Sequence, residues 1–462
     1  MQAKDIIEKA EVLRAGLSTG FRDEMVKSLY REAEIIARRA VRRAGDKKYD
    51  LDQRIDRIVT SPLTGLPIML ALLGIVIWLT VSGANIVSDA SATVLFWIGD
   101  QGKAFFEFLR LPWWITGFIW DGVYRGLAWV VSVMFPPMAI FFPAFTILED
   151  LGYLPRVAFN LDWLYRKSGA HGKQALTMAM GFGCNAAGVI ATRVIDSPRE
   201  RLIAILTNNF VPCNGRFPTL IMLATVFVAA GFSGFTASVI AAAAVVGVVL
   251  IGVGFTFLMS YLLSRTVLKG EASAFTLELP PYRRPNIRRI LYTSLIDRTL
   301  FVLWRAMQTA APAGALIWVL ANIPYHNTSL AQAIAQWLNP FGYLLGLDGV
   351  ILLAYIIAIP ANEIVVPTMM MVYTNAGMMI STPETGEAIR SLLVGGHGWT
   401  LLTAINLMLF SLLHNPCATT ILTIYKETKS LRWAAMSVVI TLGTAFLVTF
   451  LTASLARLLG LV

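Results

Sequence analysis

Long runs of apolar residues limit what this 462-residue chain can fold into more than any other feature of its sequence. Leu66 to Val81, Ala237 to Leu263 and Val438 to Leu455 are close to the length, roughly 20 residues, at which a helix crosses a bilayer. Because 56% of the residues are hydrophobic and only 14% are charged, a soluble domain could not cover such a core with polar surface. Alternating ten-residue strands, which are typical of outer-membrane barrels, are not found. We therefore expect an all-α polytopic membrane protein in a lipid bilayer.

The charges are distributed as in an inner-membrane protein. The net charge is +10, and basic residues gather at the ends of apolar runs, at Arg38 to Arg57, Arg283 to Arg298 and Lys426 to Arg432. By contrast, Ala306 to Ile389 contains no Lys or Arg. This pattern follows the positive-inside rule and argues against nucleic-acid binding. It predicts a multi-pass protein of the inner (cytoplasmic) membrane with a cytoplasmic N-terminus, which lacks the apolar core of a cleavable signal peptide.

The N-terminal region differs in character from the rest. Met25, Leu29, Ala33 and Ile36 recur at helical spacing among charged residues, which predicts an amphipathic helical stalk. The sequence leaves open whether this stalk lies on anionic lipid, packs against a partner or stands in solvent. We divide the chain into the cytoplasmic stalk (1–60), a first transmembrane helix at about 63–83 with an outer interfacial region (61–125), a first repeat (126–264), a basic cytoplasmic loop (265–298), a second repeat (299–425) and a C-terminal transmembrane helix (426–462).

The two repeats are predicted from the order of their segments. A span, a broken hairpin and a span with a Pro-Cys pair occur at 126–148, 174–195 and 202–230, and again with reversed sense at 299–322, 349–373 and 398–425. Gly or Pro interrupts both hairpins, and broken helices at membrane depth are tolerated only inside protein or along a cavity. Inverted repeats with interruptions at matching positions indicate a transport site near the midplane of the membrane.

The breaks carry the chemistry that we expect at this site. A proline frees the carbonyl four residues before it, so Pro212, Pro360 and Pro416 free those of Asn208, Ile356 and Leu412. Each freed oxygen needs water, a side chain or a cation as its partner. Cysteines lie beside three of the breaks, and an odd number of three forms no disulfide framework. The candidate metal ligands are Cys184, Cys213, Cys417, Asn185, Asn214, Glu363 and His414.

A mixed set of sulfur and oxygen ligands favours a borderline divalent transition metal over Mg²⁺ or Ca²⁺. The wide spacing of the cysteines argues against a tight structural zinc site. The competing interpretation is that the cysteines are ordinary buried residues and that Glu363 is paired with Asn362 or with an arginine. No G-x-x-x-x-G-K-[ST] motif occurs, so we expect neither an enzyme that hydrolyses nucleotides nor a cofactor.

Several motifs resemble the ferrous iron transport protein B family (FeoB), in colinear order from about residue 50 onward. They are Arg54-Ile55-Asp56-Arg57, Leu148-Glu149-Asp150-Leu151-Gly152-Tyr153, Gly181-Phe182-Gly183-Cys184-Asn185, Asp196-Ser197-Pro198-Arg199-Glu200-Arg201, Pro212-Cys213-Asn214-Gly215-Arg216, Glu278-Leu279-Pro280-Pro281-Tyr282-Arg283 and Pro416-Cys417-Ala418-Thr419. The resemblance implies two inverted gate repeats, Fe²⁺ import as the function, and an iron path through Cys184, Cys213 and Cys417.

The chain also departs from this family. Ala186-Ala187 replaces the usual Val-Pro, Asn362-Glu363 replaces Arg-Glu, and Asn214-Gly215-Arg216 replaces Ser-Ala-Arg. The GTPase domain of full-length members is missing, which leaves open a separate GTPase subunit or a small cytoplasmic accessory protein at residues 1–60, passive or ion-coupled transport, or a trimmed chain. The rival functions are transport of another solute, such as a nucleoside or another divalent metal, and a non-transporting membrane scaffold. Whether the chain forms a homo-oligomer is also open.

Overall fold

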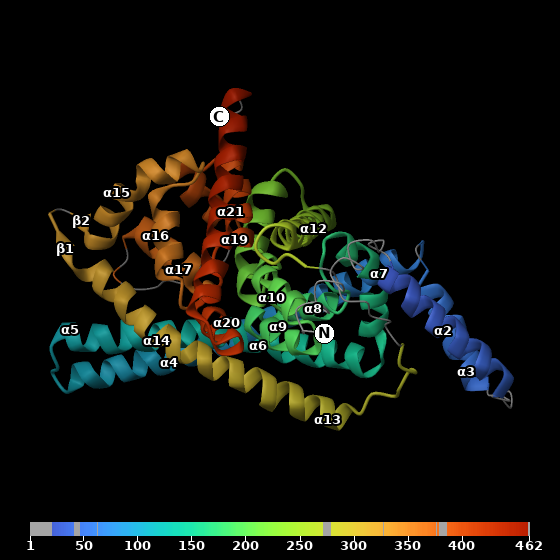
Figure 1. Cartoon of the computed structure of the whole chain (residues 1–462). Helices are drawn as coiled ribbons and strands as arrows, with labels where there is room; N and C mark the ends of the chain where they lie inside the picture. Colours follow the sequence, from blue (N-terminus) through green and yellow to red (C-terminus); the bar gives the residue numbers. More distant parts are fainter. Residues whose placement is uncertain are drawn as a thin grey trace, which may run out of the picture.

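A computed structural model describes residues 21–40, 47–61, 63–270, 279–326, 328–375, 377 and 386–460 (Figure 1). Across these ranges the chain is almost entirely helical, with one short antiparallel hairpin of β1 (Pro324–Tyr325) and β2 (Thr328–Ser329). Five helices in the described ranges are long and apolar enough to cross a membrane, and six if the bent pair at 330–357 counts as one span. The prediction of an all-α polytopic membrane protein is confirmed.

The N-terminal elements lead from the start of the described chain into the helical core. They are α2 (Phe21–Ala40), α3 (Lys47–Val59), α4 (Gly65–Phe108), α5 (Trp113–Thr116), the π-helical η1 (Gly117–Tyr124) and α6 (Arg125–Asp150). On α2, Met25, Leu29 and Ile36 are exposed, so the apolar side of the predicted stalk is uncovered. Figure 1 shows α4 running back along α6, with α5 at the far end of this pair.

The helix that contains the predicted first span is longer than the sequence predicts. We expected a span ending near residue 83 and an outer interfacial region after it, but α4 continues for 44 residues to Phe108. At ~1.5 Å per residue it is about 66 Å long, well beyond the roughly 30 Å of bilayer hydrocarbon. Hydropathy falls near residue 83, but the next proline is Pro112. The helix therefore continues beyond its apolar part, because no proline interrupts it. Lys103 Nζ, 2.7 Å from Asp121 Oδ2, ties the polar part to η1.

The rest of the chain contains two series of elements in the same order. The first comprises α6, α7 (Tyr153–Lys167), α8 (Gln174–Gly183), α9 (Asn185–Ala191), η2 (Thr192–Val194), α10 (Pro198–Thr207), η3 (Asn208–Phe210), η4 (Asn214–Arg216), α11 (Phe217–Leu223), η5 (Ala224–Val228) and α12 (Gly234–Arg265). The second comprises α14 (Phe301–Asn322), α15 (Leu330–Leu344), α16 (Gly349–Ile357), η7 (Asn362–Ile364), α17 (Val365–Thr374), α18 (Gly386–Arg390), η8 (Ser391–Gly396), α19 (Leu401–Leu413), α20 (Ala418–Thr428) and α21 (Leu431–Leu458). Between them lie α13 (Ile287–Tyr292) and η6 (Thr293–Leu300).

Each series therefore consists of a long helix, a shorter helix, a broken hairpin, a broken helix and a second long helix. In this order α21 occupies the position that α12 holds in the first series, so the segment predicted as a separate C-terminal helix completes the second series. The repeated order agrees with the two predicted repeats. Their opposite sense across a membrane stays a prediction.

The two series meet through glycines on η1, α6 and α14. A Cβ atom on Gly314 of α14 would lie 2.5 Å from the carbonyl oxygen of Gly122, and one on Gly126 would lie 3.0 Å from the Cα of Gly314. Small residues four apart, here Gly122 and Gly126, let helix backbones approach closely where lipid offers no hydrophobic drive for association. The sequence thus permits a contact between the repeats that any larger side chain would prevent.

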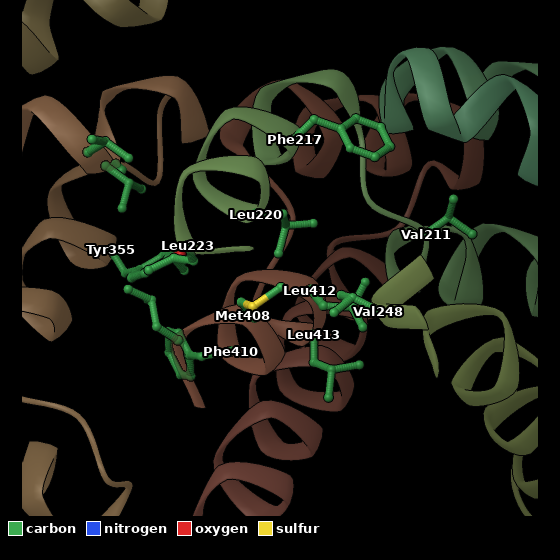
Figure 2. Close-up of a cluster of buried hydrophobic side chains, with 14 of the residues drawn as sticks. Val211, Phe217, Leu220, Leu223, Val248, Tyr355, Met408, Phe410, Leu412 and Leu413 are labelled. Atoms are coloured by element: carbon green, nitrogen blue, oxygen red, sulfur yellow. The ribbon is translucent and has the colours of Figure 1, made fainter. Parts of the chain in front are cut away.

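The two series also share a large apolar core. Figure 2 shows Leu220 and Leu223 of α11 beside Met408, Phe410 and Leu412 of α19. All five side chains are buried. Since α11 and α19 are the helices that adjoin the Pro-Cys breaks, this core holds the two broken spans together. It fixes the breaks in space.

Candidate functional site

All four predicted breaks interrupt helices in the structure. Cys184, with extended backbone angles, separates α8 from α9, and Val211 to Cys213 separate η3 from η4. In the second series, Ala358 to Ala361 separate α16 from η7, and His414 to Cys417 separate α19 from α20. The helices therefore end beside Gly and Pro residues, because glycine permits non-helical backbone angles and proline lacks the N–H that a helix needs.

Arg216 joins the two breaks that contain a Pro-Cys pair. Its side chain is almost completely buried, and its Nη1 donates to the carbonyl oxygens of Asn209 at 2.9 Å and Leu412 at 2.8 Å. Its Nη2 donates to the carbonyl oxygens of His414 at 3.0 Å and Asn415 at 3.3 Å. Four main-chain oxygens from the two repeats thus surround one fixed cation, as charge-assisted hydrogen bonds.

Asparagine amides extend this network to the first hairpin. The side-chain amides of Asn185 and Asn209 are 2.9 Å apart, and Asn209 Nδ2 donates to the carbonyl oxygen of His414 at 2.8 Å. Asn208 Nδ2 donates to the carbonyl oxygen of Asn185 at 3.0 Å. All these side chains are buried. The break at Cys184 is therefore connected to both Pro-Cys breaks.

The second hairpin closes the network through His414. The Nδ1 atom of its ring lies 2.8 Å from the carbonyl oxygen of Ser411, which can only accept, so Nδ1 carries the proton. The other nitrogen, Nε2, lies 3.3 Å from the side-chain amide of Asn362 in η7. In addition, the amide N–H of Ala418 donates to the carbonyl oxygen of Ile359 at 2.8 Å. The four breaks form one polar centre, whose hydrogen-bonding side chains are Asn185, Asn208, Asn209, Arg216, Asn362 and His414.

Glu363 lies against Gly215 at the edge of the polar centre. A Cβ atom on residue 215 would lie 2.0 Å from Glu363 Oε1 and 2.6 Å from its Cδ, so only glycine leaves room for this carboxylate. The carbonyl oxygen of Glu363 accepts from Trp129 Nε1 at 3.3 Å. The competing interpretation pairs the Glu363 carboxylate with Asn362 or an arginine, but no such hydrogen bond or ion pair is found within the described ranges. The structure instead brings Glu363 beside Cys213 and Asn214.

The three cysteines come together around this centre. Cys213 is buried, Cys184 and Cys417 are partly exposed, and each thiol lies within electrostatic range of the other two. Glu363 is within the same range of Cys213 and Cys417. Cys417 Sγ also lies 3.3 Å from Thr420 Oγ1. Within the described part of the chain, however, no three His, Cys, Asp or Glu side chains are arranged to hold a metal ion.

The freed carbonyls have protein partners in this conformation. Leu412 is bonded to Arg216, Asn208 accepts from the N–H of Val211 at 3.5 Å, and Ile356 accepts from the N–H of Ile359 at 3.4 Å. The last two contacts are long, whereas the bond from Arg216 is short. We expected water, a side chain or a cation as partner, and for Leu412 it is a side chain that carries a positive charge.

Sequence reasoning missed the role of Arg216. An arginine inside an apolar span, three residues after a Pro-Cys pair, was the available signal, because a buried cation must find oxygen partners. It also missed Asn208 and Asn209, which precede the same break and whose amides satisfy the exposed backbone. Asn214, predicted as a ligand, is buried at the start of η4.

A second connection between the repeats lies at the ends of α9 and α20. Glu427 accepts from Arg193 Nη2 at 2.6 Å and from Arg201 Nη2 at 2.8 Å. Arg193 and Arg201 belong to the first series and Glu427 to the second. This ion pair network therefore holds the first hairpin to the second broken span outside the polar centre.

Comparisons with known proteins agree with this architecture. The model of the Gate family, described as nucleoside recognition, matches residues 131–227 and 303–431. The model of the ferrous iron transport protein B C terminus matches residues 245–297. The Gate matches thus cover most of both series, including all four breaks. No solved structure is similar enough to the chain to count as a match.

Several similar curated proteins are named as iron transporters. The chain is 28% identical to the Fe(2+) transporter FeoB of Staphylococcus aureus strain MSSA476, over 88% of the chain and 59% of that protein. It is 29% identical to FeoB of Synechocystis sp., over 86% of the chain and 62% of that protein. It is 26% identical to an Fe(2+) transport protein A/FeoB fusion protein of Porphyromonas gingivalis, over 87% of the chain and 51% of that protein.

The chain therefore spans only about three fifths of the length of the relatives that it matches. Together with the breaks and their motifs, these matches are consistent with the membrane part of the ferrous iron transport protein B (FeoB) family.

Proposed function

We propose that the chain transports Fe²⁺ across the inner (cytoplasmic) membrane, with its N-terminus on the cytoplasmic side, as the permease part of an FeoB-type uptake system. The observation that carries this proposal is the meeting of four helix breaks in one polar centre, two of them inside helices long enough to span a membrane. Interrupted helices supply the backbone and side-chain atoms that replace the hydration shell of an ion. The names of the relatives, as Fe(2+) transporters, support Fe²⁺ as the cargo.

Within this function, the proposed metal path consists of Cys184, Cys213, Cys417 and Glu363, with Asn185, Asn214 and His414 beside them. Thiolate and imidazole ligands suit Fe²⁺ better than they suit Mg²⁺ or Ca²⁺, and Glu363 adds the negative charge that offsets Arg216. In the present conformation Arg216 occupies the carbonyl oxygens, and Asn362 covers Nε2 of His414. Passage of the ion through the centre therefore requires these two contacts to rearrange.

Further proposals concern energy and partners. The chain lacks a nucleotide-binding loop, so we expect the purified chain to show no GTP hydrolysis. A separate GTPase subunit or a small accessory protein would act through residues 1–60. The name of the Porphyromonas gingivalis relative, which joins transport protein A to FeoB, supports a small accessory partner. The exposed apolar side chains of α2 support residues 1–60 as its docking region.

The test is solute competition in proteoliposomes that contain the purified chain. We expect Fe²⁺ uptake into these proteoliposomes to exceed Fe²⁺ uptake into protein-free liposomes. Mn²⁺ and Zn²⁺ should each reduce this Fe²⁺ uptake, to different extents. A nucleoside should neither enter nor compete. Nucleoside uptake without metal uptake would contradict the proposal and favour the solute named in the description of the Gate family.

A further inference from the structure

A second polar pocket lies apart from the polar centre, where α15, α16 and α17 meet the residues before α19. Its volume is about 340 Å³. The polar residues that line it are Gln332, Gln336, Asn339, Asp348, Tyr373 and His397. We call it the Asp348 pocket. From this pocket and the charges around it, we infer a capture site for a hydrated divalent transition-metal cation, bound through Asp348 and His397. This inference deepens the proposed function and rests on it.

The first step is the charge of Asp348. Its Oδ1 accepts from the N–H of Ile351 at 2.8 Å, and its Oδ2 accepts from the hydroxyl of Tyr373 and from Trp399 Nε1 at 3.3 Å. All three donors are neutral, and no ion pair is found for this carboxylate within the described ranges. Its negative charge is therefore held in place without being compensated by a basic side chain.

The second step is the absence of competing cations in the sequence around the pocket. Every lining residue except His397 lies between Ala306 and Ile389, the stretch without Lys or Arg. A concave wall that carries one sign of charge raises the local concentration of ions of the opposite sign. The pocket thus attracts cations.

The third step is the set of donors. The ring of His397 packs on Tyr373 with the centroids 4.3 Å apart, and the Tyr373 hydroxyl is bonded to Asp348, so imidazole and carboxylate belong to one cluster. His397 itself is exposed, and no hydrogen bond of its ring nitrogens is found among the residues that the structure describes. One imidazole, one carboxylate and nearby amide oxygens suit a borderline metal ion such as Fe²⁺ or Co²⁺.

The fourth step is size. At ~30 Å³ per water in the liquid, the pocket holds about eleven waters, which is enough for a metal ion that keeps most of its hydration shell. Two direct protein ligands with the remainder supplied by water give a weak site. A capture site must release its ion, so weak binding is what this position requires.

The fifth step connects the pocket to the polar centre. Val350 at the start of α16 and Val372 at the end of α17 line the pocket, whereas Glu363 lies at the opposite end of the same hairpin. The intervening α16 has nine residues, about 14 Å at ~1.5 Å per residue. An ion released from the Asp348 pocket is one short helix away from the proposed metal path.

The test is a titration of the purified chain in detergent with Co²⁺. Binding is monitored by calorimetry and by the visible absorption of the bound ion. The variants are His397→Gln and Asp348→Asn. His397→Gln is the informative one, because His397 is exposed and takes no part in starting α16. We expect each variant to weaken Co²⁺ binding by at least about tenfold. The matched control is His326→Gln, which changes another exposed histidine and should bind Co²⁺ as the wild type does.

A second measurement separates this inference from the proposed function. In proteoliposomes, His397→Gln should raise the KM for Fe²⁺ by a similar factor. If the wild type transports Fe²⁺ and both variants bind Co²⁺ as it does, the capture site is wrong while the function stands. If the wild type binds Co²⁺ but transports no Fe²⁺, and His397→Gln loses Co²⁺ binding, the function fails while the site stands. A wild type that binds no Co²⁺ at millimolar concentration also overturns the site.

Discussion

The guanidinium group of Arg216 donates a 2.8 Å hydrogen bond to the carbonyl oxygen of Leu412, the oxygen that Pro416 leaves without a helical partner. The two residues are 196 positions apart and belong to different repeats. The same guanidinium bonds Asn209, which precedes the break at Pro212. A single buried cation thus satisfies both Pro-Cys breaks. Its loss would leave buried carbonyls unpaired in each repeat at once.

Replacement of Arg216 should therefore destabilise the fold. Hydrogen bonds to charged groups contribute about 1.5–3 kcal/mol each, and their loss here strands several buried oxygens. We expect Arg216→Met to lower the free energy of unfolding by roughly 3–5 kcal/mol. Arg216→Lys should have a smaller effect, since an ammonium keeps the charge but has three donors in place of five. The measurement is the thermal midpoint in detergent.

The matched control for this prediction is Arg288→Met, which removes an exposed arginine of α13. It should leave the midpoint within experimental error. A midpoint for Arg216→Met equal to that of the control would show that the bonds of Arg216 add no net stability.

The contact between Glu363 and Gly215 leads to a prediction about flux. In Gly215→Ala the new Cβ atom would lie 2.0 Å from Glu363 Oε1, so the carboxylate must leave its position. If Glu363 is part of the metal path, Fe²⁺ flux should fall roughly tenfold, which corresponds to ~1.4 kcal/mol. Gly254→Ala is the control, because a Cβ atom on Gly254 meets nothing within 4 Å.

A double mutant distinguishes this mechanism from a general disturbance of η4. When Gly215→Ala acts only by displacing Glu363, adding it to Glu363→Gln should produce no further loss of flux, since contacting residues are not additive. Two independent losses that add in the double mutant would contradict a common cause.

The breaks could be predicted from sequence because their causes are local. Proline lacks the N–H that a helix needs, and glycine permits the chain to leave the helix, so Pro212, Pro360 and Pro416 indicate where helices end. Their partners could not be predicted in the same way. The bond from Arg216 to Leu412 depends on how two repeats pack, which no local pattern contains.

The length of α4 shows a different limit. Hydropathy describes where a lipid-facing helix loses its apolar character. This change occurs near residue 83, so hydropathy predicts that the helix ends there. The backbone continues to Phe108 because no proline occurs before Pro112 and Lys103 finds Asp121 across the pair. Helix ends and membrane boundaries are thus separate properties, and only the second is encoded in hydropathy.

A cluster at the end of the stalk predicts how α3 is anchored. Asp56 on α3 accepts from Arg156 Nε at 3.0 Å and from the hydroxyl of Tyr282 at 2.8 Å. The Arg156 side chain is 1% exposed and also packs on the Tyr282 ring, with its Cζ 4.1 Å from the ring centroid. Asp56→Ala strands this buried guanidinium and should cost about 3 kcal/mol, the low end for a buried pair, because Asp56 is itself 26% exposed.

The expected result is faster proteolysis between the stalk and α4, with a lower unfolding midpoint. Tyr282→Phe removes only one neutral donor and should cost about 0.5–1.5 kcal/mol. Equal effects of Asp56→Ala and Tyr282→Phe would show that the buried guanidinium of Arg156 does not dominate the cluster.

The same cluster predicts a pH dependence. Burial, followed by the hydrogen bond to Asp56, raises the pKa of Tyr282 from 10.0 to about 12. Since the folded state holds this proton more tightly, the contribution to stability is complete below pH 10 and is lost as the pH rises towards about 12. Tyr282→Phe should remove this part of the alkaline loss, as measured by the midpoint between pH 9 and 11. An unchanged alkaline profile in Tyr282→Phe would assign the loss to other groups.

The cysteines give the most direct test of the metal path. Serine is similar in size to cysteine but presents a hard oxygen in place of a soft sulfur, so Cys184→Ser and Cys417→Ser change the ligand more than the packing. The contact of the Cys417 thiol with Thr420 Oγ1, at 3.3 Å, can also be made by a hydroxyl. We therefore expect both variants to insert and fold normally while Fe²⁺ flux falls.

The loss of flux should be larger for Fe²⁺ than for Mn²⁺, because Mn²⁺ accepts an oxygen ligand in place of sulfur more readily than Fe²⁺ does. Flux of both ions in proteoliposomes, normalised to the amount of inserted protein, is the measurement, and Thr441→Ser on α21 serves as a conservative buried control. Unchanged Fe²⁺ flux in both cysteine variants would remove these thiols from the path. In that case Cys213, Glu363 and His414 would be the remaining ionisable ligands proposed in the centre, and Glu363→Gln would become the deciding variant.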